Sequence, residues 1–198
     1  MFDSPEKKDF TSVRKKFIWI GGAGMAHKGL DLVLEAFKSL PDFSLTVFGK
    51  ADKDFVEIYK KELFETDNIR FEGHVDLSSK KFMDASSNSL GLIFPSCSEG
   101  CSGGVVTSMH AGLIPIISYQ SGVDVEDFGV ILRENTIQEI SSEIRKMSDK
   151  NPEELRTMSV KAWEFAREHY TRETFRLSYE RVIDELEQNL HKSLISQK

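Results

Sequence analysis

Short runs of apolar residues alternate along the chain with stretches in which apolar residues recur every three or four positions. The continuous runs favour strands that are buried on both faces, as in a parallel sheet. They predict strands at residues 17–20, 43–48, 69–71, 92–94, 114–117 and 130–132. The stretches with helical spacing predict helices at residues 30–40, 53–64 and 79–85, a short helix from residue 103, and three helices after residue 136. Strands that alternate with helices in this way predict an α/β fold, a doubly wound, Rossmann-like parallel sheet in a single domain with extra C-terminal helices.

The two ends of the chain read differently from its middle. Residues 1–15 are charged and poor in apolar residues, and we expect a linker or a frayed N-terminus there. Residues 16–185 form the predicted Rossmann-like domain, and residues 186–198 are expected to be the end of the C-terminal helix and a tail. The last helix, which carries Phe175 and Tyr179, is most simply interpreted as a packed amphipathic helix.

Composition and charge exclude several classes of protein. The chain is 39% hydrophobic and 29% charged, as ordinary globular domains are. Its net charge of −6, without a block of Lys and Arg, argues against nucleic acid as a partner. No apolar stretch approaches the roughly 20 residues of a transmembrane segment. The N-terminus lacks the apolar core of a signal peptide, so we expect a cytoplasmic location.

Two loops carry the candidate chemistry, and the first is the glycine-rich stretch 21–29. It fails the dinucleotide fingerprint because His27 stands where the third glycine belongs. It fails the P-loop pattern because Lys28 precedes Gly29, and no Gly-Lys-Ser/Thr sequence follows. What remains is one lysine at the start of a helix, and both features favour an anion.

The second loop follows the strand at 92–94 and carries one carboxylate, Glu99. Gly103 and Gly104 then open a short helix, whose backbone N–H groups form a ready anion site. Cys97 and Cys101 flank Glu99, but their spacing is not that of a redox pair, and no Cys/His partners complete a zinc site. We interpret them as reduced, structural cysteines. The sequence predicts no metal site.

Four segments, in this order, resemble the C-terminal half of family 4 (group 1) glycosyltransferases. They are GGAGMAHKGLDLVLEAF, LTVFGK, NIRFEGHV and PSCSEGCSGGVVTSMHAGLIPII. The resemblance implies the nucleotide-sugar donor domain of a GT-B fold, in a retaining, metal-independent enzyme that needs no cofactor. The donor substrate would be a nucleoside-diphosphate sugar, and the acceptor a glycan or a lipid-linked glycan. In that family an N-terminal acceptor-binding domain comes first, which is missing here and through which a peripheral membrane association would arise.

The resemblance also implies roles for individual residues. Lys28 would contact the donor diphosphate and stabilise the leaving group, and Glu99 would hydrogen-bond hydroxyls of the donor sugar, which makes these two the predicted catalytic residues. Thr107 stands where the family has a second glutamate that holds the ribose, and Ala23 where it has an arginine. The residues expected to bind the donor are Gly22, Gly24, Lys28, Gly73, His74, Glu99, Gly100, Gly103, Gly104 and Thr107.

Two other functions stay open on the sequence. The losses at Ala23 and Thr107 favour a non-catalytic interaction domain on the same fold. A sugar-nucleotide epimerase or hydrolase would need a general base near the site, and His110 and Glu126 are the local candidates.

Overall fold

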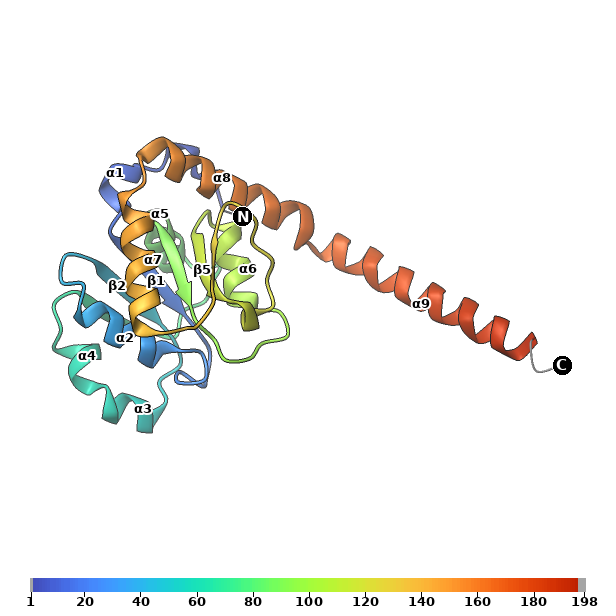
Figure 1. The fold of residues 1–198 in the computed structure, drawn as a ribbon, viewed down its shortest axis with the longest axis horizontal. Coiled ribbons are helices and arrows are strands. Elements are labelled where there is room, and N and C mark those ends of the chain that lie inside the picture. The colour runs from blue at the N-terminus through green and yellow to red at the C-terminus, as the bar shows by residue number, and fades with distance from the viewer. Residues whose placement is uncertain (1, 196–198) are drawn as a thin grey trace. The chain divides into compact units, whose positions relative to one another are not determined.

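The computed structural model describes residues 2–195 and contains one six-stranded parallel sheet (Figure 1). The strands stand in the order β3-β2-β1-β4-β5-β6, and each pairs in parallel with its neighbours. Their bounds are Lys16–Ile20 (β1), Ser44–Phe48 (β2), Ile69–Gly73 (β3), Gly91–Phe94 (β4), Ile114–Ser118 (β5) and Val130–Leu132 (β6). This order confirms the doubly wound α/β fold. Successive strands are added in one direction from β1 to β3 and in the opposite direction from β4 to β6, and such sheets bind ligands at this switch between β1 and β4.

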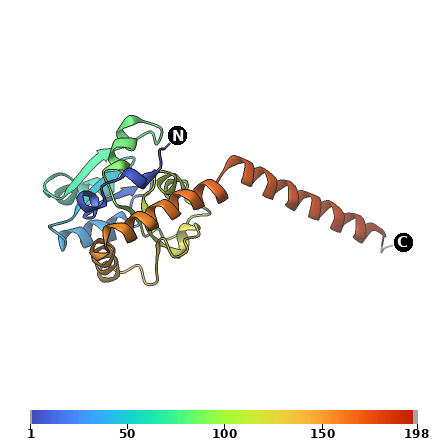
Figure 2. The same ribbon diagram turned by 90° about the horizontal axis from the view of Figure 1, so that it is seen from above.

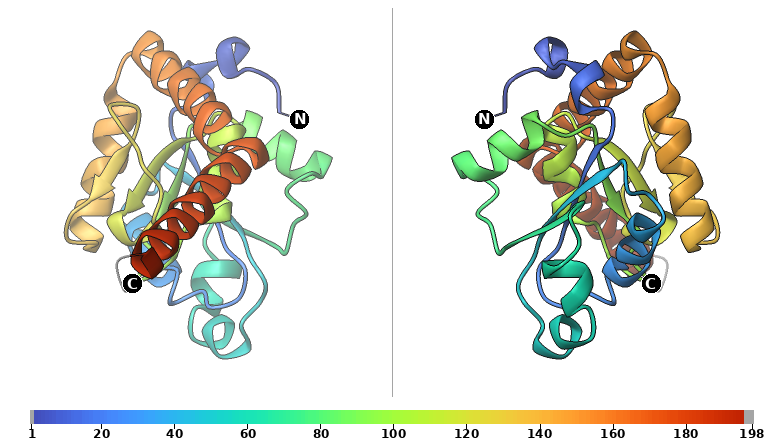
Figure 3. Two further views of the ribbon diagram at one scale, coloured as in Figure 1. Left: turned by 90° about the vertical axis from the view of Figure 1, so that its right-hand side faces the viewer. Right: turned by 90° about the vertical axis from the view of Figure 1, so that its left-hand side faces the viewer.

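Helices cover both faces of the sheet. Right-handed crossovers carry α2, α3 and α4 over one face and α5 and α6 over the other, and α7 packs against α2. Figure 3 shows the yellow-orange α7 and the green α5 on opposite sides of the sheet. The bounds are Leu30–Lys38 (α2), Lys53–Ile58 (α3), Lys60–Phe64 (α4), Lys80–Ser87 (α5), Gly103–His110 (α6) and Ile137–Asp149 (α7).

The strand pattern explains where the core lies. All four residues of β4 and all five of β5 are buried, as expected for strands covered on both faces. One predicted helix is wrong in detail, because residues 53–64 form two short helices instead of one. The break lies at Tyr59, whose backbone leaves the helical region and whose ring stacks on Phe55 at 4.7 Å.

Residues 2–15 do not form the expected linker or frayed terminus. They form a 3-10 helix, Pro5–Lys7, and a short helix α1, Phe10–Val13. Pro5, Phe10 and Val13 are buried. These three apolar residues are too few and too irregularly spaced to stand out in a charged stretch, so their burial was not visible in the sequence.

Lys8 connects this N-terminal segment by hydrogen bonds to the C-terminal ends of two helices. Its Nζ donates to the backbone carbonyls of Ser86, Ser89 and Gly112 at 3.0–3.2 Å. Ser86 lies in the last turn of α5, and Ser89 and Gly112 lie just after α5 and α6, where the helix dipole favours a cation. Figure 2 shows the blue N-terminal segment lying beside the green α5. The lysine therefore supplies a charged donor to carbonyls at the C-terminal ends of two helices.

Lys8 gives the fold a pH dependence that can be measured. Burial lowers the pKa of Lys8 from 10.5 to about 7. Between pH 7 and the pKa of an unfolded lysine, the unfolded chain keeps a proton that the folded chain releases, so stability rises with pH. We expect the free energy of unfolding of the wild type, relative to that of Lys8→Met, to increase from pH 7 to pH 9. Urea unfolding at these pH values checks this, with exposed Lys7→Met as the matched control. A difference in the free energy of unfolding between the wild type and Lys8→Met that stays constant with pH would contradict the lowered pKa of Lys8.

The chain divides into two compact units, Met1–Glu164 and Phe165–Lys198. The first therefore ends well before the predicted boundary at residue 185. Helix α8, Pro152–His169, is followed by α9, Arg172–Ile195. Within the second unit, Phe175 and Tyr179 stack on each other with ring centroids 5.9 Å apart, and 70% and 60% of their surfaces are exposed. Of the predicted tail, residues 186–195 belong to α9, and 196–198 lie outside the described residues.

Candidate functional site

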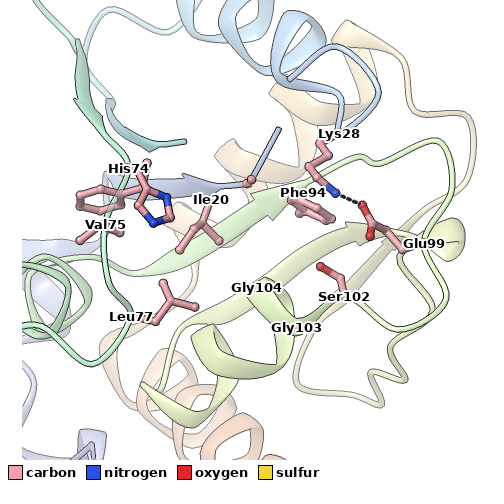
Figure 4. Close-up of a pocket in the computed structure, with 13 residues that line it drawn as sticks. Ile20, Lys28, His74, Val75, Leu77, Phe94, Glu99, Ser102, Gly103 and Gly104 are labelled. Atoms are coloured by element: carbon pink, nitrogen blue, oxygen red, sulfur yellow. Dashed lines mark hydrogen bonds and ion pairs between the residues drawn. The ribbon is translucent and has the colours of Figure 1, made fainter. Parts of the chain in front are cut away.

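A cavity of about 220 Å³ lies at the carboxyl edge of the sheet, where β1 and β4 end side by side. Figure 4 shows its lining, with Lys28 and Glu99 at one end and His74 at the other. Carboxyl ends of adjacent parallel strands at a switch in strand order are where open α/β sheets bind ligands. The lining residues are Ile20, Gly21, Gly22, Lys28, Phe48, His74, Val75, Leu77, Phe94, Glu99, Ser102, Gly103 and Gly104.

Lys28 is positioned by the buried indole of Trp19. The indole Nε1 donates to the carbonyl oxygen of Lys28 at 3.2 Å, which fixes the lysine backbone over the end of β1. Gly21 makes this arrangement possible, because a Cβ there would lie 2.4 Å from the Trp19 ring and 3.0 Å from Cδ of Lys28. The lysine side chain passes over the aromatic ring of Phe94, with Nζ 5.8 Å from the ring centre. The ammonium group therefore reaches into the cavity on an apolar support.

Lys28 and Glu99, which lie 71 residues apart in the sequence, form an ion pair in this cavity (Figure 4). Only 18% of each side chain is exposed. Glu99 Oε1 also accepts a hydrogen bond from the hydroxyl of Ser96 at 3.2 Å. The two residues that the sequence predicted as catalytic are thus brought into direct contact by the fold.

A group of buried serines holds the loop that carries Glu99. Ser118 Oγ donates to the carbonyl of Ser96 at 2.6 Å, and Ser121 Oγ donates to that of Phe94 at 3.1 Å. The backbone N–H of Glu99 donates to Gln120 O at 2.9 Å. The sequence reasoning missed these serines. The available signal was that Ser96 and Ser118 stand at the ends of two apolar runs, where their hydroxyls can satisfy loop carbonyls.

The two loops also contact each other directly. Cys97 N donates to His27 O at 2.9 Å, and His27 Nε2 lies 2.8 Å from Ser98 O. Gly29 lies under Pro95 with a φ of +69°, and a Cβ there would be 2.3 Å from Pro95 O. This close approach, together with the hydrogen bonds, fixes the distance between the loop of Lys28 and the loop of Glu99.

The start of α6 lines the cavity beside this ion pair. Helix geometry leaves its first N–H groups without an acceptor inside the helix. Ser102 at the N-cap makes no side-chain cap, and no acidic side chain lies in the first turn. Gly103 and Gly104 leave the backbone accessible, and Gly104 sits so close to β1 that a Cβ would be 3.2 Å from Ile20 Cγ2. These N–H groups and the helix dipole favour an anion.

Six of the ten residues predicted to bind the donor line this cavity, namely Gly22, Lys28, His74, Glu99, Gly103 and Gly104. Gly24, Gly73, Gly100 and Thr107 do not line it. Gly24 and Gly73 adopt positive φ values of 81° and 72°, which gives them a role in the turns. Thr107 lies further along α6 and is half-buried. Binding roles for all ten stay predictions.

The sequence reasoning missed most of the apolar part of the cavity, which Ile20, Phe48, Leu77 and Phe94 form together with Val75. Three of these end strands, and their side chains were assigned to the core because the strands read as buried throughout. The candidate bases His110 and Glu126 do not line the cavity. Ala23 is exposed and brings no charge to the site.

Two negative findings apply to the described residues. Within 2–195, no cluster of three or more His, Cys, Asp and Glu side chains is arranged to hold a metal ion, and Cys97 and Cys101 are free and exposed. None of the helices in that part of the chain is long and apolar enough to span a membrane.

Solved structures share this fold at low sequence identity. The chain superposes on Anabaena HepE in complex with UDP and glucose with a TM-score of 0.73 and 13% identity, over 88% of this chain and 49% of that one. Sucrose-phosphate synthase from Thermosynechococcus elongatus gives 0.71 and 17%, over 88% and 46%. WaaG, a glycosyltransferase involved in lipopolysaccharide biosynthesis, gives 0.65 and 18%, over 85% and 46%. The chain thus spans about half the length of these proteins.

Comparison by sequence gives one match and one negative result. No curated protein sequence matches the chain. The family model described as glycosyl transferases group 1 matches residues 3–164, which include the whole sheet, both loops and every residue that lines the cavity. This match extends over most of the chain and confirms the resemblance carried by the four sequence motifs. The chain therefore belongs to the group 1 glycosyl transferase family.

Proposed function

We propose that this chain is the donor-binding half of a retaining, metal-independent glycosyltransferase that uses a nucleoside-diphosphate sugar. The observation that carries the proposal is the meeting of three features at one cavity: the Lys28 ammonium, the Glu99 carboxylate and the start of α6. An ammonium and a helix N-terminus suit a diphosphate. A carboxylate beside them suits the hydroxyl groups of a sugar.

In this proposal the chemistry is the departure of the nucleoside diphosphate through an oxocarbenium-like transition state. Negative charge develops on the leaving diphosphate as the glycosidic bond breaks. Lys28 and the N–H groups of Gly103 and Gly104 would stabilise that charge, and fixed donors of this kind contribute most where water is largely excluded. They would supply the positive charge that a metal ion supplies elsewhere.

The other end of the cavity suits the uncharged part of the donor. His74, Val75 and Leu77 follow β3 and present a mainly apolar wall, where we place the base or ribose. A cavity of about 220 Å³ is smaller than the roughly 300–1,000 Å³ of a typical ligand site. The donor would therefore extend beyond this cavity, toward an acceptor-binding half that lies outside this chain. A cytoplasmic location, peripheral membrane association through that half, and a glycan or lipid-linked glycan acceptor belong to the same proposal.

Calorimetric titration of the chain with UDP, GDP and ADP tests the donor-binding role. We expect weak binding of one of the three, with a Kd in the upper micromolar to millimolar range, and no sugar transfer by this chain alone. The affinity should be the same in EDTA as in millimolar Mg²⁺, because the charges in the site come from the protein. Absence of binding to any of the three at millimolar concentration, or binding that requires Mg²⁺, would contradict the proposal.

A non-catalytic interaction domain is the second candidate, favoured by two positions. Ala23 brings no cation to the site. Thr107 stands at the position where the family would place a ribose-binding carboxylate, and it lies outside the cavity. The two functions differ in what they require of Lys28 and Glu99. A catalytic role predicts that Lys28→Ala with Glu99→Ala changes the cellular glycan, whereas an interaction role predicts an unchanged glycan. An epimerase or hydrolase has less support, because His110 and Glu126 do not line the cavity.

A further inference from the structure

Lys28 and Glu99 form an ion pair with each other, although the proposed function assigns each of them to a different part of the ligand. Lys28 would bind the diphosphate, and Glu99 the sugar. In the structure these two residues bind each other, with only 18% of each side chain exposed. Neither group is therefore fully hydrated, and a diphosphate that binds Lys28 competes with Glu99 for its ammonium group.

The backbone that carries Glu99 is held in place when this happens. Its backbone N–H is held by Gln120 O at 2.9 Å, and the loop is pressed against Gly122, where a Cβ would lie 2.2 Å from Gly100 O. The remaining partner of its carboxylate is the Ser96 hydroxyl at 3.2 Å. A bare diphosphate would thus leave a poorly solvated carboxylate beside two phosphate charges. Like charges in such a position oppose binding.

A sugar on the diphosphate changes this balance. Its hydroxyl groups can donate to the Glu99 carboxylate in place of the lysine, and hydrogen bonds to a charged acceptor are roughly twice as strong as neutral ones. We propose that Glu99 makes this site select a sugar-bearing nucleoside diphosphate over the bare nucleoside diphosphate, by holding Lys28 until sugar hydroxyls replace it. This inference rests on the proposed function. Selectivity here is a difference between two affinities, and it also favours release of the nucleoside diphosphate once the sugar has left.

The test measures the affinity of the full chain for UDP and UDP-glucose, and for GDP and GDP-mannose, by calorimetry. The proteins are the wild type, Glu99→Gln, Lys28→Met and the double variant. Glu99→Gln frees Lys28, so we expect it to bind the bare nucleotide about fivefold more tightly, the effect of an ion pair worth about 1 kcal/mol. The preference for the sugar-bearing form should fall by at least the same factor. In the Lys28→Met background, Glu99→Gln should bring a smaller gain, because it removes only the repulsion between the carboxylate and the phosphates.

Each alternative has its own outcome. Equal tightening by Glu99→Gln in both backgrounds would show general charge repulsion and overturn the role of Lys28. Unchanged or weaker binding of the bare nucleotide by Glu99→Gln would overturn the inference while leaving the proposed function intact. Absence of nucleotide binding by both the wild type and Glu99→Gln would overturn both. Glu57→Gln, on the exposed side of α3, is the matched control and should behave as the wild type.

Discussion

Replacing Lys28 with methionine is expected to weaken nucleoside diphosphate binding by about 10- to 100-fold, the loss of one strong, charge-assisted contact. In a complete enzyme of the proposed kind, we expect sugar transfer to slow by about 10²–10³-fold, as when a preorganised donor to a developing anion is removed. The physical reason is the position of Nζ, which reaches the cavity over the Phe94 ring. The backbone of Lys28 is held by the hydrogen bond from Trp19. Calorimetry measures the first effect, and release of nucleoside diphosphate from the donor measures the second.

Two further variants separate charge from shape at this position. Lys28→Arg keeps the charge and should retain part of the affinity, although the planar guanidinium group does not reproduce the geometry of an ammonium. Lys60→Met removes an exposed lysine from α4 and should leave binding unchanged. Nucleotide binding by Lys28→Met that equals the wild type would exclude Lys28 from the site.

Replacing Gly29 with alanine is expected to destabilise the fold and to separate the two loops of the site. Gly29 has a φ of +69°, and a non-glycine residue in the left-handed region costs about 1–3 kcal/mol. In addition, its Cβ would lie 2.3 Å from Pro95 O, a backbone atom that cannot rotate away. Urea unfolding measures the stability, and nucleotide titration under native conditions measures the damage to the site.

Gly24 provides the matched comparison in the same loop. It also has a positive φ, +81°, but the nearest atom to its Cβ position would be His27 Cβ at 3.6 Å, an ordinary contact. Gly24→Ala should therefore show the backbone effect alone. The difference between the two variants isolates the close approach of the loops. Equal losses of stability in both would mean that Pro95 and Gly29 do not set the distance between Lys28 and Glu99.

Much of the fold could be predicted from the sequence because strands and helices leave different periodicities. The runs that end at Ile20, Phe48, Phe94 and Ile117 are strands in the structure, and their spacing by helices predicts a parallel sheet. The pattern failed where order depends on a few isolated contacts. Phe10 and Val13 are buried in a charged stretch, and the Lys8 ammonium is fixed by three carbonyls that no local pattern indicates.

The candidate site was predicted less completely than the fold. Motif order was enough to single out Lys28 and Glu99, and the glycines at 103 and 104 marked the helix start that faces them. Thr107 was included because of its place in the motif, but it does not line the cavity. A position along a motif does not tell which way the side chain of a helix residue faces. The serines that hold the Glu99 loop carry no motif, and their hydrogen bonds depend on β4 and β5 lying side by side.

By itself, the sequence determined the α/β class, the strands and most helices, and the family, and it singled out the two charged residues that meet in the cavity. Local periodicity and motif order are properties of the chain alone, so they can be recognised in the sequence without a structure. Only the tertiary structure decided that Lys28 and Glu99 form an ion pair across 71 residues, that Gly29 and Pro95 bring their loops together, and that the N-terminal segment closes the ends of α5 and α6. These features depend on which segments become neighbours in the sheet, and neighbours in space are set by packing over the whole domain.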